Sequence, residues 1–146
     1  MKLYRGFLDL SKKGISENLY LKTPRLPRDS HIHIHETADG WFYERFGIKA
    51  RSQTIFCTPD IEQAKEYGTP YVVTVPTGTD YKLIFSVDVK DFIEIEADIS
   101  DVNATSQILD WLEKKSYSMV TDFEALPSDF EGEVMLYCTH YEVLNT

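Results

Sequence analysis

The residues that could do chemistry gather in four short motifs of the 146-residue chain. They are Tyr4-Arg5-Gly6, His31-Ile32-His33-Ile34-His35, Arg51-Ser52-Gln53-Thr54-Ile55-Phe56 and Phe130-Glu131-Gly132-Glu133. An arginine at the end of a strand can present a planar guanidinium to a phosphate or ribose. Two carboxylates two residues apart repel each other, which a protein tolerates in solvent or uses beside a cationic reaction centre. Taken alone, each of these two motifs also fits an ordinary surface.

The histidine motif alternates histidine with isoleucine. On a strand, this alternation would put His31, His33 and His35 on one face and both isoleucines on the other. Such a row could bind zinc, but no spaced set of further ligands accompanies it, and the remaining histidine is His140. Three interpretations stay open: a solvated strand face, a row that lines a substrate cleft, and a metal site. We expect that activity requires no metal.

The hydroxyl-bearing motif is predicted to form a strand over residues 52–58. Ser52, Thr54 and Phe56 would then share one face of that strand. Two hydroxyls and a ring on one face suit a ligand with an aromatic head and polar edges. The alternative is an ordinary edge strand.

The elements around these motifs mix strands and helices without regular alternation. Strands are predicted over residues 2–10, 52–58, 71–75, 81–87, 92–96, 119–123, 134–138 and 141–144, and helices over residues 37–46, 59–67 and 105–115. Pro24 and Pro27 predict an extended loop over residues 22–30, and Gly47 and Gly68 are expected to end the first two helices. The order favours an α+β fold.

Composition predicts one domain over residues 1–146, because 42% hydrophobic residues can supply a single core. No run approaches the ~18 apolar residues of a membrane span, and the first residues do not look like a signal peptide. Cys57 and Cys138 are the two cysteines, which excludes a disulfide framework or a cysteine-rich zinc site. A cytoplasmic location is expected, in the cell of origin or in a host cell.

The net charge of −9 is unevenly distributed. Residues 1–85 hold 12 basic and 10 acidic residues, a balance of +2, and residues 86–146 hold 3 and 14, a balance of −11. The acidic second part would repel a nucleic acid, and no broad basic stripe compensates for it. A small anion could still bind to the basic residues of the first part.

In their order along the chain, three of the motifs resemble those of the ADP-ribosyltransferase family, in its arginine/serine/glutamate branch. Tyr4-Arg5-Gly6, Ser52-Gln53-Thr54 and Glu131-Gly132-Glu133-Val134-Met135 stand where that family has a Tyr-Arg-Gly-like start, a Ser-x-Ser/Thr strand and a Glu-x-Glu followed by aliphatic residues. The resemblance runs over nearly the whole chain. Gln53 departs from the usual central threonine, and the histidine motif has no counterpart.

The resemblance implies two packed, mostly antiparallel sheets with flanking helices, and NAD bound as a substrate in the cleft between the sheets. Arg5 would contact a phosphate or ribose of NAD, and Ser52 would hydrogen-bond Glu133 and hold it in place. Thr54 would belong to the same cofactor-binding face, and Phe56 would be a ring partner for nicotinamide.

The resemblance also implies the catalytic roles. Glu133 would bond the 2′-hydroxyl of the nicotinamide ribose and stabilise the positive charge that develops as nicotinamide leaves. Glu131 would orient an incoming guanidinium, which points to arginine of an unknown target protein as the acceptor. Tyr67 would be a second ring partner for nicotinamide.

Three other functions stay open. The same site could hydrolyse NAD, with water as the acceptor. The chain could instead be a non-catalytic interaction module, with its aromatic-rich first half and acidic second half as partner surfaces. A histidine-based metal hydrolase is the last alternative.

Overall fold

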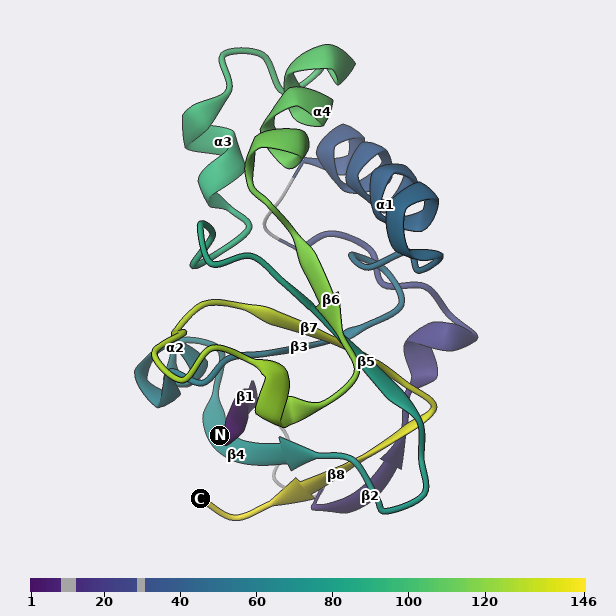
Figure 1. Ribbon diagram of the computed structural model, residues 1–146, viewed down its shortest axis with the longest axis vertical. Coiled ribbons are helices and arrows are strands. Elements are labelled where there is room, and N and C mark those ends of the chain that lie inside the picture. The colour runs from purple at the N-terminus through teal and green to yellow at the C-terminus, as the bar shows by residue number, and fades with distance from the viewer. Residues whose placement is uncertain (9–12, 29–30) are drawn as a thin grey trace.

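A computed structural model describes residues 1–8, 13–28 and 31–146. These residues form two four-stranded antiparallel sheets and four α-helices (Figure 1). The strands are β1 (Leu3–Phe7), β2 (Gly14–Glu17), β3 (Ile55–Cys57), β4 (Thr69–Thr74), β5 (Tyr81–Phe85), β6 (Ser118–Val120), β7 (Val134–Cys138) and β8 (His140–Leu144). The helices are α1 (Ile32–Phe46), α2 (Ile61–Lys65), α3 (Glu94–Asp98) and α4 (Thr105–Lys114), with short 3-10 helices η2 (Leu19–Leu21) and η3 (Phe123–Ala125). The predicted α+β class with two antiparallel sheets is confirmed.

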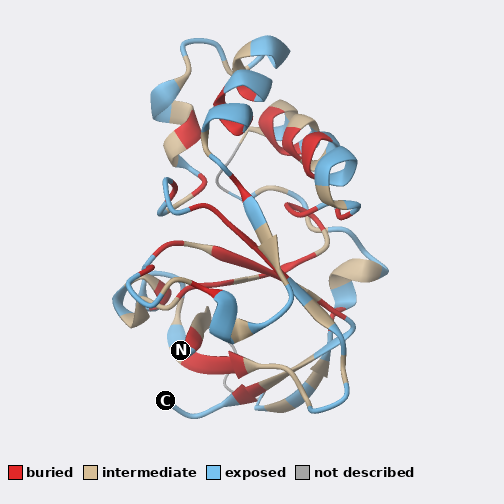
Figure 2. Ribbon diagram, in the orientation of Figure 1, coloured by how far each residue is buried: buried red, intermediate tan, exposed pale blue. Residues whose placement is uncertain are grey.

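The sheet with strand order β3-β7-β5-β6 lies in the middle of the molecule. Because side chains alternate along a strand, its two faces supply two different cores. Ile84 and Met135 point into a helix-side core, built with the buried residues of α1, α3 and α4. Leu83 and Leu136 point into a sheet-side core, built with Leu3 of the β1-β4-β8-β2 sheet and its neighbours. The central strands are accordingly buried over much of their length (Figure 2).

The edges of the two sheets meet and then separate. β1 and β3 are edge strands of their sheets, and they are joined at Tyr4 and Thr58 by two backbone hydrogen bonds of 2.7 and 2.9 Å. β1 otherwise pairs with β4, and β3 with β7. The divergence of these edges leaves open space between the sheets next to Arg5, whose side chain reaches back to β3.

The strand on which the histidine motif was interpreted does not form, because these residues begin α1. His31 caps the helix: its Nδ1 accepts from the His33 backbone N–H at 3.2 Å. Ile34 is fully buried while Ile32 is 45% exposed, which a common strand face would not allow. The apolar spacing from Ile34 through Ala38 to Trp41 has the period of a helix and outweighs the short alternation.

Other elements differ in smaller ways. Residues 92–96 were expected to be a strand but contribute to α3, and β2 was not predicted. The strand expected over residues 52–58 shortens to Ile55–Cys57, because residues 50–54 form turns and bends. Of the strand predicted over 2–10 and the loop over 22–30, residues 9–10 and 29–30 lie outside the described residues. Within the described ranges, no helix combines the length and apolar character needed to cross a membrane.

Candidate functional site

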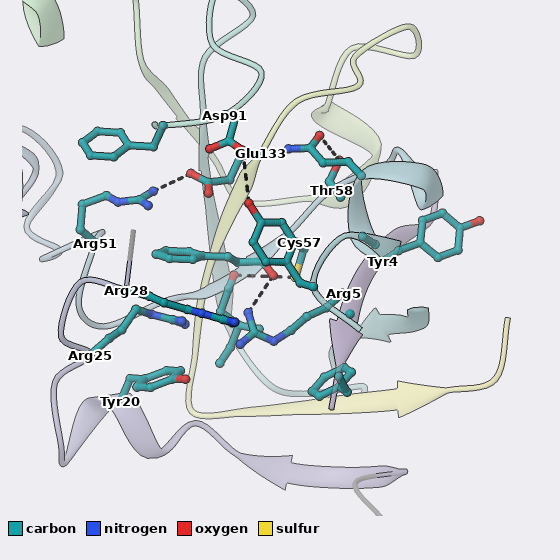
Figure 3. A pocket seen from close by; sticks show the side chains of 18 of the residues that line it. Tyr4, Arg5, Tyr20, Arg25, Arg28, Arg51, Cys57, Thr58, Asp91 and Glu133 are labelled. Carbon is teal, nitrogen blue, oxygen red and sulfur yellow. Dashed lines mark hydrogen bonds and ion pairs between the residues drawn. The ribbon is translucent and has the colours of Figure 1, made fainter. Parts of the chain in front are cut away.

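A cavity of about 830 Å³ lies at the separation of the two sheets (Figure 3). Its walls come from β1, β2, η2, the loop at residues 25–28, α1, β3, α2, residues 91–93 and β8, with Glu133 just before β7. This volume is in the range of pockets that bind small molecules and cofactors. Segments from both ends of the chain therefore line one cavity.

Three arginines lie on one side of this cavity, and carboxylates lie on the other (Figure 3). Arg5 projects from β1, and its Nη1 donates to the Phe56 carbonyl at 3.0 Å. Arg25 and Arg28 come from the proline-containing loop. Three guanidiniums around one space form a site suited to an anionic group such as a phosphate.

Arg25 is held by stacking and by the turn beside it. Its guanidinium lies 4.0 Å from the Tyr20 ring centroid and 3.9 Å from that of Phe56. Its Nη2 donates to the Thr54 carbonyl at 2.8 Å, and its backbone N–H donates to the Ser52 carbonyl at 2.9 Å. These contacts fix the plane of the guanidinium against the cavity wall.

The Arg25 guanidinium is nevertheless poorly solvated. Burial lowers the pKa of Arg25 to about 10, and the nearby positive charge of Arg5 acts in the same direction. Its Nε is buried, and among the described residues it has no hydrogen-bond partner. A bound anion would offset both costs, since it would supply an opposite charge and acceptor atoms.

Glu133 is the carboxylate on the opposite side, and it is paired with Arg51. Arg51 Nη1 lies 2.5 Å from Glu133 Oε1, and the two side chains are 8% and 16% exposed. The Glu133 backbone N–H donates to the Lys90 carbonyl at 3.0 Å, just before β7 begins. Both the side chain and the backbone of Glu133 are thus fixed where it faces the cavity.

Arg51 itself lies between two rings. Its guanidinium is 4.1 Å from the ring centroids of both Phe56 and Phe92. Since Arg25 also lies about 4 Å from the Phe56 centroid, the two cations must occupy opposite faces of that ring. Asp39 Oδ1 accepts from the Arg51 backbone N–H at 2.8 Å and fixes the turn from which the side chain extends.

His35 is the member of the histidine motif that lines the cavity. It is 6% exposed, and its Nε2 lies 4.0 Å from Asp39 Oδ2. Burial lowers the pKa of His35, the nearby carboxylate of Asp39 opposes that shift, and the positive charge of Arg51 adds to it. His33 points elsewhere, with its Nε2 2.9 Å from the Thr105 hydroxyl. The three histidines therefore have different positions: His31 caps α1, His33 contacts α4, and His35 lines the cavity.

The residues proposed from sequence separate into two groups. Four of them line the cavity: Arg5, Phe56, Tyr67 and Glu133. Tyr67 donates from its hydroxyl to Asp91 Oδ2 at 3.3 Å, and both residues belong to the wall. The other three are not part of the wall: Ser52, Thr54 and Glu131.

Ser52 and Thr54 turn their hydroxyls into the local backbone. The Ser52 hydroxyl lies 3.5 Å from the Lys49 carbonyl, and the Thr54 hydroxyl donates to the Ala50 carbonyl at 2.6 Å. Glu131 is exposed on a separate shallow depression, and its carbonyl accepts from the Thr58 hydroxyl at 3.1 Å. The side-chain bond to Glu133 that was expected from Ser52 is made by Arg51 instead.

The sequence did not point to Arg25 or Arg28 as cavity residues. It named Arg51 without a role of its own, and His35 as one member of a row that could line a cleft. Arg51 is the first residue of the hydroxyl-bearing motif, but on a regular strand it would face away from Ser52, and the observed turn removes that constraint. Arg25 stands between two prolines, in a loop without periodicity. The one available signal was the excess of basic residues in the first part of the chain.

Metal binding and nucleophilic attack by a cysteine have little support in this cavity. Within residues 1–8, 13–28 and 31–146, no three His, Cys, Asp or Glu side chains are grouped so that they could hold a metal ion. Cys57 lines the cavity, but burial raises its pKa to about 12, so its thiol stays protonated and a weak nucleophile near neutral pH. The strongest chemical feature of the cavity is thus the separation of the guanidiniums of Arg5, Arg25 and Arg28 from Glu133.

Compared with known protein families, curated proteins and solved structures, the chain matches no family model, no curated protein and no solved structure.

Proposed function

We propose that this protein cleaves the bond between nicotinamide and ribose in NAD and transfers the ADP-ribose to a protein. The observation that carries the proposal is that Glu133 and the arginines Arg5, Arg25 and Arg28 line the same cavity. NAD needs both features, since it carries a diphosphate and develops a ribosyl cation when nicotinamide leaves. The ADP-ribosyltransferase-like fold that the sequence motifs imply is part of the same proposal.

The arginines bind the phosphates of NAD. Arg25 contributes most to specificity, because its plane is fixed between Tyr20 and Phe56 and its Nε lacks a partner among the described residues. Arg5 is fixed by its bond to the Phe56 carbonyl. A planar guanidinium held in one orientation loses little freedom on binding, so its hydrogen bonds to phosphate are used efficiently.

Glu133 acts at the reacting end. When the bond from C1′ to the nicotinamide nitrogen breaks, the electron pair leaves with nicotinamide, which becomes neutral. The positive charge then moves to the ribose, and a fixed carboxylate stabilises it where it develops. The lone pair of the acceptor forms the new bond to C1′, and the acceptor loses a proton to solvent.

The mouth of the cavity favours a protein as the acceptor. Leu8, Leu19 and Leu26 line it and are 83%, 60% and 76% exposed. Exposed leucines gathered around one opening are typical of a surface that binds another protein. Arginine as the acceptor residue had its support from Glu131, which lies outside the cavity wall, so we propose no particular acceptor side chain.

Hydrolysis of NAD is a second candidate. It is favoured by the exposed position of Glu131, because no second glutamate of the motif lies in the cavity to activate a protein nucleophile. Water would then take the place of the acceptor at the same C1′ carbon.

The test is to incubate the protein with labelled NAD and a cell lysate, and to measure nicotinamide release and protein labelling in the same samples. We expect Glu133→Gln to keep the side-chain shape and lose both activities, by a factor on the order of 10²–10³. Glu131→Gln is the matched control, and it should retain nicotinamide release because it changes no wall residue.

The outcomes separate the candidates. Labelled protein supports transfer, and nicotinamide release without label supports hydrolysis. If the folded wild-type protein releases no nicotinamide, the proposed function is wrong. If Glu131→Gln loses label but keeps nicotinamide release, an acceptor role for Glu131 is restored.

A further inference from the structure

We infer that Arg51 is the positioning residue that holds Glu133 in the orientation needed at the ribosyl cation. The inference rests on the proposed function. Its starting observation is that Glu133 Oε1 accepts from Arg51 Nη1 at 2.5 Å, whereas no described residue donates a hydrogen bond to Oε2. One carboxylate oxygen is thus held and the other is left for the substrate.

The position of the Arg51 guanidinium is itself fixed from several sides. Phe56 and Phe92 each lie 4.1 Å from it, one from β3 and the other from the segment before α3. Its Nη1 also lies 3.3 Å from the sulfur of Met135, and its backbone is held by Asp39. A guanidinium stacked between two rings cannot follow a moving carboxylate, so the carboxylate must conform to the guanidinium.

The charge of Arg51 has an opposing effect. A cation beside Glu133 offsets part of the negative charge that would stabilise a ribosyl cation. Arg51 can therefore help catalysis only by fixing the orientation of the Glu133 carboxylate. Preorganised groups are worth most when they need no rearrangement during the reaction, and a buried carboxylate without a partner would be costly to keep.

Lysine cannot replace arginine in this role. Its ammonium keeps the charge but lacks the planar group that stacks between Phe56 and Phe92. We expect Arg51→Lys to lower kcat for nicotinamide release by about 10²-fold, with KM for NAD and the affinity for ADP-ribose changed by less than about threefold. A general loss of structure would instead weaken binding as well.

Arg45 offers a matched control. Its guanidinium lies 5.4 Å from the Trp41 ring centroid and its Nη1 lies 3.7 Å from Glu113 Oε2, but it is about half exposed and is not part of the cavity wall. Arg45→Lys makes the same chemical change to an arginine with an aromatic and an acidic neighbour. It should leave kcat and KM unchanged.

A measurement without substrate tests the coupling directly. In a double-mutant cycle of Arg51→Met and Glu133→Gln, each single variant should lower the free energy of unfolding. The double variant should be less destabilised than the sum of the two, because each single variant leaves a buried group without its partner.

The results discriminate among the possibilities. Additive effects in the cycle, or an Arg51→Lys variant with wild-type kcat, would overturn the inference. A rise in KM alone would also overturn it, since Arg51 would then bind substrate instead of positioning Glu133. If the wild type releases no nicotinamide while the cycle shows coupling, the proposed function fails and the Arg51–Glu133 coupling stands, without a role in NAD cleavage.

Discussion

At the scale of single residues, His35 is a buried titratable group in the wall of the cavity. The ring is buried, with Asp39 as its nearest carboxylate and the charges of Arg25 and Arg51 close by. Burial and the positive charges of Arg51 and Arg25 disfavour the imidazolium, whereas Asp39 and a hydrogen bond with the Arg25 backbone favour it. Since the pKa of His35 is lowered on balance, the folded protein prefers the neutral ring.

We predict that His35 lowers stability in acid. Below the unfolded-state pKa of about 6.5, the unfolded chain binds the proton more readily than the folded one. The free energy of unfolding therefore falls as pH drops from about 6.5 towards the folded pKa, and above about 6.5 the residue has no effect. Urea denaturation between about pH 7.5 and 5 should show a smaller acid loss for His35→Gln than for wild type.

The control for this prediction is His140→Gln, since His140 is exposed. That variant should keep the wild-type dependence on pH. An unchanged acid loss in His35→Gln would mean that the ring titrates alike in the folded and unfolded chains.

Glu133 and Arg51 show what could be found from sequence at this scale. Arg5 and Glu133 could be proposed from motif order, and both line the cavity. Arg51 could not, because its contact with Glu133 spans 82 residues along the chain and is created by the turn at residues 50–54. Local periodicity holds no information about such a contact.

At the scale of elements, β1 and α2 touch at Gly6. A Cβ added there would lie 2.2 Å from the Ala64 carbonyl oxygen and 2.8 Å from the Gly68 nitrogen. Both neighbours are backbone atoms, so a small side-chain movement cannot relieve the clash. Because Arg5 precedes Gly6, this close approach also sets the position of the Arg5 side chain relative to the cavity.

We predict that Gly6→Ala lowers the free energy of unfolding by about 1–3 kcal/mol, as overpacking does. The measurement is urea denaturation followed by circular dichroism. Gly40→Ala is the matched control, since a Cβ there would meet nothing within 4 Å and Gly40 lies inside α1. That control should raise stability by about 0.5–1 kcal/mol, because alanine favours a helix. Equal effects of the two variants would contradict the proposed clash.

Helices and strands were predicted correctly where the periodicity of the apolar residues matches the face that is buried against neighbouring elements. The strand over residues 134–138 is β7 as predicted, with all but one of its residues buried, and the helix over residues 105–115 differs from α4 by one residue. The interpretation of the histidine motif on a strand was wrong, because the five alternating residues belong to a helix whose apolar spacing continues to Trp41. Short alternations decide little when a longer period follows.

At the scale of the whole molecule, the central sheet joins the two cores. Neighbouring residues of β5, Leu83 and Ile84, point into different cores and are both fully buried. The α+β class could be predicted from the sequence, because it depends only on how helices and strands are mixed along the chain. The cavity could not be predicted from the sequence, because its position depends on where the edges of the two sheets separate.

The prediction of one domain over residues 1–146 can be tested with the chain's own probes. Trp41 and Trp111 are its two tryptophans, and both lie in the helix-side core. Cys57 and Cys138 are its two cysteines, and both lie in the sheet-side core at 3% and 2% exposure. Tryptophan fluorescence and thiol reactivity therefore follow the unfolding of different cores.

We predict that both probes report the same urea midpoint, because the two cores share the strands β3, β5 and β7 and neither can open alone. Leu112→Ala in the helix-side core and Leu83→Ala in the sheet-side core remove the same group from fully buried sites. Each should lower the free energy of unfolding by about 2–5 kcal/mol and shift both probes together. If Leu112→Ala moved only the fluorescence transition while the thiols stayed protected, the chain would consist of two separately unfolding parts, and the cavity walls from α1 and β1 could then change independently.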